Sequence, residues 1–310
     1  MLDLRRLRLL HELHERGTIA AVADALRFTP SAVSQQLAVL EREAGVPLLE
    51  RAGRGVRLTD AALVLATHAT ELLDRADRAE AELAAAAENV AGRGRIAAFQ
   101  SVALRVAAPA MARLADEAPA LRCELVEAEP EASLPALALG DVDLVLADEW
   151  EHQPLRRPPG VERHDLHREP VRVVLPADHP LVRAHPRGAP VPLRALRDAV
   201  WTCGHAGGAW PDMVERTCRS FGGFDPEIRH RTNDAVVTLS LVAGGFAVTL
   251  LPDFVGAAEH PGVVVRDLAE GTPHRTILAA TRAADAARPS VRALLGAVRG
   301  VADELGWSVG

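Results

Sequence analysis

Residues 19–43 constrain what this chain can fold into more than any other stretch of its sequence. The letters IAAVADALRFTPSAVSQQLAVLERE predict two short helices joined by a turn at Arg27 and Phe28. Thr29 stands where a helix N-cap is expected, and Pro30 stands at the first helical position, where its missing N–H costs nothing. Both helices carry one apolar face of helical spacing, made by Val22, Ala23, Leu26, Val33, Leu37 and Leu40.

The outward side of the second helix has the chemistry of a DNA reader. Ser31, Ser34 and Gln35 are short, uncharged side chains near the helix N-terminus, and such groups can hydrogen bond to base edges. An ordinary helical hairpin with a polar outer face is the alternative, because helix-turn-helix patterns are short and degenerate. Residues 45–51 and 53–58 then predict two strands around a tip rich in Gly and Arg, which is the pattern of a wing.

The blocks TPSAVSQQLAVLE, GVPLLER and GRGVRLTDA match the N-terminal domain of LysR-type transcriptional regulators in order and spacing, so the chain resembles this family. The resemblance implies a winged helix-turn-helix that binds double-stranded DNA. Many relatives carry Arg where this chain has Gln35, and a glutamine suits adenine, so the target preference does not carry over. Contacts with DNA are expected from Thr18, Thr29, Pro30, Ser31, Ser34, Gln35, Arg51 and, in the minor groove, Arg54.

Charge is distributed unevenly along the 310 residues. The net charge of −7 argues against a protein that coats DNA through general basicity. Residues 1–58 are nevertheless net basic, at +2 (9 Arg against 7 acidic residues), whereas residues 59–92 are at −5 (2 Arg against 7 acidic residues). Since +2 is small, we expect DNA affinity to require a dimer and to fall steeply with salt.

From residue 59 to about residue 89 the chain lacks Gly and Pro, which predicts one helix of roughly 46 Å. A surface helix packed on its own domain is one interpretation. We expect instead a coiled-coil-like dimer helix, because the family's linker helix stands here and small residues let two helices approach closely. The expected seam comprises Ala62, Ala66, Ala69, Leu73, Ala76, Leu83 and Ala87.

Beyond residue 92 strand and helix patterns alternate. The β-α-β-α-β order of residues 95–147 predicts a parallel sheet, and further strands are expected at 170–175, 200–203, 227–232, 247–251 and 276–281. The motifs GDVDLVLA, REPVRVVLPADHPL and NDAVVTLSLVAGGFAVTLLP resemble the family's effector-binding region, a two-subdomain fold like that of periplasmic binding proteins.

The expected fold class is therefore α/β with three parts. Residues 1–58 form the winged helix-turn-helix, residues 59–91 the linker and dimerisation helix, and residues 92–310 the effector-binding domain. Within that domain, the resemblance places subdomain I at 92–165 plus 270–310 and subdomain II at 166–269.

Small ligands of such folds bind between the subdomains, where strands end and helices begin. Ser101 is the first choice, because a hydroxyl at a strand-to-helix junction matches the family's ligand-contacting position. Each candidate residue at such a junction could equally act as a helix cap, and for Asn233 capping is the stronger interpretation. The candidate effector-binding residues are Gln100, Ser101, Val102, Glu127, Asp148, Gly204, His205 and Asn233.

Catalytic and metal sites find no support in the sequence. It has no G-x-S-x-G elbow and no H-E-x-x-H pair, and the loop around Gly204 lacks a phosphate-loop lysine, so no cofactor is expected. Cys203 and Cys218 raise the alternative of a thiol redox sensor, since some family members sense peroxide in this region. Two small buried residues are the favoured interpretation.

The sequence thus predicts a LysR-type regulator that is not an enzyme. The resemblance implies a homodimer, assembling to a tetramer, on a near-palindromic promoter site, with a small effector altering DNA bending and contact with RNA polymerase. A ligand-independent architectural DNA-binding protein is the alternative. No signal peptide or membrane span is apparent, and we expect a cytoplasmic protein.

Overall fold

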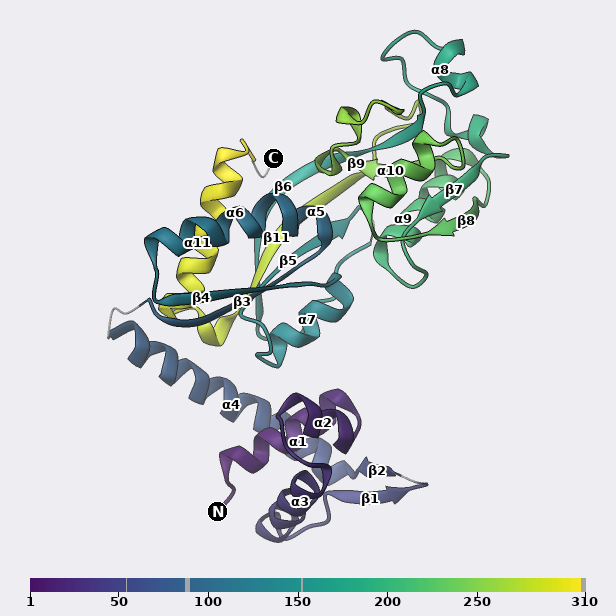
Figure 1. Ribbon diagram of the computed structural model, residues 1–310. Helices are drawn as coiled ribbons and strands as arrows, with labels where there is room; N and C mark the ends of the chain where they lie inside the picture. Colours follow the sequence, from purple (N-terminus) through teal and green to yellow (C-terminus); the bar gives the residue numbers. More distant parts are fainter. Residues whose placement is uncertain (54, 87–89, 152, 308–310) are drawn as a thin grey trace. The chain divides into compact units, whose positions relative to one another are not determined.

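The computed structural model describes residues 1–53, 55–86, 90–151 and 153–307 (Figure 1). The chain divides into two compact units, one comprising residues 1–88 with 284–288 and the other residues 89–283 with 289–310. Among the described residues, no helix is both long and apolar enough to cross a membrane.

The N-terminal unit is a winged helix-turn-helix followed by a long helix. Its elements are α1 (Leu4–Arg16), α2 (Ile19–Ala25), α3 (Pro30–Ala44), β1 (Leu49–Ala52), β2 (Gly55–Leu58) and α4 (Asp60–Ala86). Side chains of Asp3, Thr18 and Thr29 cap α1, α2 and α3 by accepting hydrogen bonds from backbone N–H groups of the first turn. Gly17 and Gly45 end α1 and α3 in the left-handed conformation that glycine adopts at low cost. The predicted helix pair, its turn and the hairpin of the wing are confirmed.

Helix α4 begins as part of the N-terminal domain's own core. Ala62, Ala66 and Ala69 are almost fully buried in the cluster that α1 and α3 line, and Thr70 Oγ1 lies 3.1 Å from His11 Nδ1 of α1. These three alanines are therefore unavailable to a partner helix, contrary to the expectation for the first half of the seam. Further along α4 the apolar side chains of Leu72 and Leu83 remain exposed. Ala87 lies outside the described residues.

The second unit is built on a mixed seven-stranded sheet of order β10-β6-β11-β5-β3-β4, with β9 added beside β6. Strand β3 pairs in parallel with both β4 and β5, as predicted, whereas β11 runs antiparallel to β5 and β6. The strands are β3 (Gly92–Ala98), β4 (Leu121–Glu127), β5 (Leu144–Trp150), β6 (Val161–Pro176), β9 (Thr249–Pro252), β10 (Val263–Arg266) and β11 (His274–Arg282).

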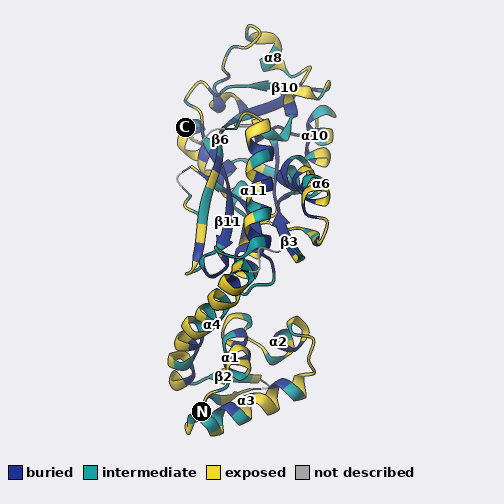
Figure 2. Ribbon diagram, turned by 90° about the vertical axis from the view of Figure 1, so that its left-hand side faces the viewer, coloured by how far each residue is buried: buried dark blue, intermediate teal, exposed yellow. Residues whose placement is uncertain are grey.

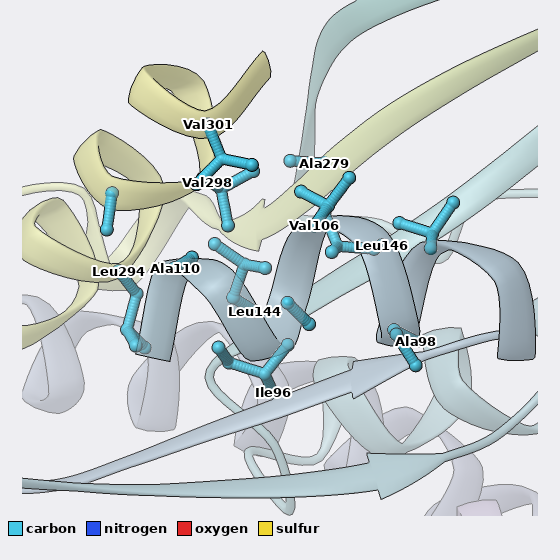
Figure 3. Close-up of a cluster of buried hydrophobic side chains, with 14 of the residues drawn as sticks. Ile96, Ala98, Val106, Ala110, Leu144, Leu146, Ala279, Leu294, Val298 and Val301 are labelled. Carbon is cyan, nitrogen blue, oxygen red and sulfur yellow. The ribbon is translucent and has the colours of Figure 1, made fainter. Parts of the chain in front are cut away.

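Helices cover both faces of this sheet, and alternate residues of each strand face opposite layers. On one face, Ile96 and Leu144 pack against the helical run that begins with α5 (Gln100–Val102) and continues to α6 (Ala108–Glu117), and against α11 (Pro289–Glu304) (Figure 3). On the other face, Ala97 and Val145 pack against α7 (Pro130–Ala138). The strands at the centre of the sheet are accordingly buried along their length (Figure 2).

Strand β6 joins the two subdomains of this unit. Up to Pro170 it pairs with β11, and from Val171 onward it pairs with β9 and β10. Subdomain II adds α8 (Pro180–Ala184), β7 (Val200–Cys203), α9 (Ala209–Thr217), β8 (Glu227–Arg231) and α10 (Ala235–Ala243). Since β6 runs unbroken across residue 165, the pairing changes five residues beyond the expected boundary.

The sequence analysis of the sheet needs two corrections. The strand expected at 170–175 is the second half of the 16-residue β6, whose first half escapes notice because it is rich in charged and histidine residues. Strand β10 was not expected at all.

Candidate nucleic-acid interface and ligand cleft

The start of α3 presents an exposed polar surface. Thr29 Oγ1 accepts from Ala32 N at 3.2 Å and lies 3.2 Å from Ser31 Oγ, and Ser34 Oγ donates to Pro30 O at 2.9 Å. Gln35 is exposed, and its amide makes no hydrogen bond within the described part of the chain. Among the predicted base-contacting side chains it is therefore the one with all its donors and acceptors available.

A groove beside this helix collects further predicted residues. Thr18, Pro30 and Arg51 line it, together with glycines of the α1–α2 turn and of the wing. Thr18 caps α2 through its hydroxyl, and Arg51 on β1 is exposed with no ion pair among the described residues. Arg54 lies outside the described residues. The groove thus joins the N-termini of α2 and α3 to the wing, which suits contact with a phosphate backbone.

Half-buried carboxylates hold this interface together, and the sequence analysis did not foresee them. Glu41 Oε1 accepts from Leu48 N at 2.9 Å and from Leu49 N at 3.0 Å, so α3 fixes the start of the wing. Arg6 Nε donates to Glu43 Oε2 at 3.0 Å, joining α1 to α3. Local sequence patterns could not reveal these contacts, because the partners of Glu41 and Glu43 lie outside the helix that carries the two carboxylates.

A cleft lies between the two subdomains of the second unit. It contains two adjoining hollows of about 470 and 330 Å³, both partly open to solvent and both lined by Glu129, Asp148, Trp150, Trp210 and Asn233. Three hydrogen bonds cross the cleft: Asn233 Nδ2 to Glu129 Oε1 at 2.8 Å, Ala235 N to Gln100 Oε1 at 2.7 Å, and Ala209 N to Glu131 Oε1 at 3.0 Å.

The floor of the cleft is a buried arginine between two carboxylates. Arg275, only 4% exposed, donates from Nε and Nη2 to Glu169 Oε1 at 3.0 and 2.6 Å and from Nη1 to Asp148 Oδ2 at 3.2 Å. Its guanidinium carbon lies 5.2 Å from the ring centroid of Phe99 and 5.3 Å from that of Trp150. Each of its three nitrogens is therefore engaged by a carboxylate, and two aromatic rings lie near the guanidinium.

Two carboxyl groups of the cleft hold their protons to unusually high pH. Burial raises the pKa of Asp148 to about 6, although the ion pair with Arg275 opposes the shift. Glu129 keeps contact with solvent at the mouth of the cleft, yet the surrounding protein and, next, the Asp148 charge raise its pKa to about 7. Both shifts record first the cost of ionising a carboxyl group in a partly dehydrated space.

The structure brings most of the predicted effector-binding residues to this cleft. Gln100, Ser101, Asp148 and Asn233 line the larger hollow, and His205 lines the smaller one. Gly204 is buried directly behind Asn233, where a Cβ would lie 2.8 Å from Asn233 Oδ1.

Two predicted residues do not reach the cleft. Val102 points into the core of subdomain I and is fully buried. Glu127 is exposed at the end of β4, which lies at the edge of the sheet, and lines neither hollow. Sequence reasoning also missed Glu129, Trp150, Trp210 and Arg275, although Glu129 stands at a helix start and could have been found there.

The two cysteines have the chemistry of core residues. Cys203 and Cys218 are fully buried, and burial raises the pKa of their thiols to about 11 and about 12. A thiol sensor needs an accessible thiolate at neutral pH, so this environment argues against the redox alternative. The described residues also hold no cluster of three metal-ligating side chains.

A winged helix-turn-helix joined to a two-subdomain ligand-binding fold defines a class, the ligand-responsive DNA-binding regulators. Residues 4–63 match the family model of the bacterial regulatory helix-turn-helix protein, lysR family, and residues 87–303 match that of the LysR substrate binding domain. The chain belongs to the LysR family of transcriptional regulators.

Relatives and solved structures agree over nearly the whole chain. It is 27% identical to the regulator XapR of Escherichia coli, covering 87% of this chain and 89% of the relative, and 27% identical to the probable regulator LrrA of Synechococcus elongatus, covering 98% and 99%. Full-length OxyR of Pseudomonas aeruginosa has a similar fold (TM-score 0.67, 23% identity, 96% and 95% covered). So does full-length CbnR in complex with its target DNA (TM-score 0.53, 22% identity, 97% and 100% covered).

Proposed function

We propose that this regulator reads a near-palindromic site in double-stranded DNA through α3 and the wing. The observation that carries the proposal is Gln35, exposed and unpaired at the start of α3 beside a groove that Thr18 and Arg51 line. A glutamine amide can make paired hydrogen bonds to adenine in the major groove, and Arg51 can meet phosphate. Arg54 at the wing tip is proposed for the minor groove.

We infer that the cleft holds a small effector that controls this DNA binding. The hydrogen bonds of Glu129, Gln100 and Glu131 across the cleft stabilise a closed arrangement of the two subdomains. A ligand that binds to these groups shifts the equilibrium toward one arrangement of the subdomains only to the extent that it binds that arrangement more tightly than the other. The resulting change in placement of the DNA-binding domains, and thereby in contact with RNA polymerase, is the proposed output. No catalytic step is assigned to the cleft.

Two copies are proposed to pair through the exposed part of α4, and pairs to assemble into a tetramer. Leu72 and Leu83 are 47% and 74% exposed on this helix, and apolar side chains left exposed on a long helix are typical of a helix-pairing face. A dimer doubles the small positive charge of residues 1–58 and engages two half-sites.

A footprint on the DNA upstream of the protein's own gene tests the reader helix. Wild-type protein is expected to protect a dyad, with protection that weakens as salt rises. Gln35→Ala is expected to lose about 1–3 kcal/mol of discrimination at one base pair of each half-site. Gln36→Ala is the matched control, because Gln36 is equally exposed on α3 but is turned toward Arg6, 3.4 Å away.

Diffuse protection that neither substitution alters would overturn the assignment. That result would favour the architectural alternative, in which the protein binds DNA through its backbone alone and the second unit serves oligomerisation.

A further inference from the structure

The ligand cleft holds more carboxylates than cations. Asp148, Glu129 and Glu131 line its hollows and Glu169 lies beneath them, whereas Arg275 is the single guanidinium among them. With all groups ionised, this cluster carries a net charge of −3. An anionic effector would add to that charge, and a cationic effector would offset it.

The one arginine of the cleft is already paired with two of the protein's own carboxylates. Three of its five N–H groups donate to Glu169 and Asp148, and its guanidinium carbon lies 5.2 and 5.3 Å from the ring centroids of Phe99 and Trp150. The carboxylates of Glu169 and Asp148 therefore already compensate its positive charge.

Helix N-termini, the other common anion sites, are also occupied by the protein itself. Glu131 accepts from Ala209 N at the start of α9, and Asp234 accepts from the first N–H groups of α10. Gln100 completes α10 by accepting from Ala235 N. The starts of α5 and α7 carry no side-chain cap, and at the start of α7 the carboxylates of Glu129 and Glu131 disfavour an anion.

Asp148 leaves an oxygen for a ligand. Asp148 is 6% exposed. Its Oδ2 accepts a hydrogen bond from Arg275 Nη1, and no described residue donates to its Oδ1. It lines both hollows, as does Glu129, whose Oε2 likewise receives no hydrogen bond from the described residues. A carboxylate oxygen without a donor, on a side chain that lines a hollow, is a place that an N–H cation would fill.

Aromatic rings complete the surroundings. Trp150 and Trp210 line both hollows, and Trp210 is held by a hydrogen bond of 3.0 Å from its Nε1 to Leu250 O. Tryptophan faces attract organic cations.

We propose, resting on the proposed effector role of this cleft, that the effector is a small organic amine in its protonated form. Its ammonium group donates to Glu129 and Asp148, and its apolar part lies against Trp150 and Trp210. The recognition differs from that of a carboxylate ligand at a helix N-terminus, because Glu131, Asp234 and Gln100 already accept from the first N–H groups of α9 and α10.

The acid–base state of the empty cleft agrees with this assignment. Burial and then neighbouring carboxylates raise the pKa of Glu129, with Asp148, Glu131 and Glu127 all contributing in that direction. A bound cation acts on the same carboxylates with the opposite sign, so amine binding is expected to release protons near neutral pH. The uncharged or positive neighbours that face Glu129 are Asn233, His205 and Arg275.

Three probes of one skeleton test the charge preference in the full-length protein: benzylamine, benzyl alcohol and benzoate. Calorimetric titration at pH 8 is expected to detect benzylamine with a Kd at least tenfold lower than that of the alcohol, and no benzoate binding. Glu129→Gln keeps the acceptor for Asn233 but removes the charge, and it is expected to weaken benzylamine about tenfold, as the loss of one charge-assisted hydrogen bond implies.

Glu124→Gln is the matched control, since it makes the same change on the neighbouring strand β4, where Glu124 is exposed and lines neither hollow, and it is expected to leave the Kd unchanged. Tighter binding of benzoate, equal weakening by both substitutions, or binding of none of the three probes would overturn the amine assignment. The footprint at the promoter is measured without any probe, so a failure of the DNA-reading proposal remains distinguishable.

Discussion

At the scale of single residues, Arg275 decides how the ligand cleft is built. It is buried on β11 and neutralises carboxylates from two other strands, Asp148 of β5 and Glu169 of β6. Glu169 in turn accepts from Phe254 N at 2.6 Å, which attaches a loop of subdomain II to the same charge cluster. Removing one member of such a cluster leaves the others buried without a partner.

Arg275→Met is therefore expected to lower the free energy of unfolding by about 3–5 kcal/mol, as for other broken buried ion pairs. Arg168→Met is the control on β6. Arg168 is exposed and forms one ion pair of 3.5 Å with Glu151, and such a surface pair contributes about 1 kcal/mol or less to the free energy of unfolding. Urea denaturation followed by circular dichroism measures both. Equal, small losses would show that the Arg275 cluster contributes no more than a surface pair.

At the scale of elements, α4 has two successive roles. Its first turns complete the core of the winged domain through Ala62, Ala66 and Ala69. Its later turns expose Leu72 and Leu83. The alanines let α4 lie close to α1, whereas the two leucines stay exposed in the part of the unit that the structure describes.

Leu83→Asp is expected to weaken self-association at least tenfold, because it places a charge in the proposed helix pair. Leu63→Asp is the matched control, as Leu63 is also exposed on α4 but about 160° around the helix from Leu83, at 100° per residue. Sedimentation velocity over a range of concentrations measures the association. Equal effects of the two substitutions would remove this face of α4 from the dimer.

At the scale of the whole molecule, we expect the titrating groups of the ligand cleft to link the stability of the fold to pH. Glu129 and Asp148 take up protons more readily in the folded protein than in the unfolded chain, whose ordinary pKa values are 4.5 and 3.8. The folded state thus binds more protons between about pH 4 and 7, so the free energy of unfolding falls as the pH rises through this range.

Thermal unfolding of the full chain is accordingly expected to occur at a lower temperature at pH 8 than at pH 5.5. Glu129→Gln should reduce the difference, because it removes one of the two titrating groups. Scanning calorimetry at the two pH values measures it, with Glu124→Gln as the control. A wild-type midpoint that rises with pH, and a difference that Glu129→Gln leaves unchanged, would contradict the linkage.

Local sequence determined the DNA-binding domain and the alternation of strands and helices. Thr18, Thr29 and Pro30 mark helix starts through contacts within one turn, and apolar spacing identifies the buried faces of α2 and α3. Such signals depend on neighbours a few residues away, so they can be read without the fold. The positions of Ser101, Asp148 and Asn233 at strand ends and helix starts could be predicted for the same reason.

Only the tertiary structure decided which faces and charges meet. The alanines of α4 could have packed on their own domain or on a partner, and the periodicity is the same in both cases. Glu129, Trp150, Trp210 and Arg275 come from segments that are separated by up to 146 residues, so nothing in their local sequence joins them. The negative charge of the cleft, which underlies the proposed amine preference, exists because the fold brings these carboxylates together around one arginine.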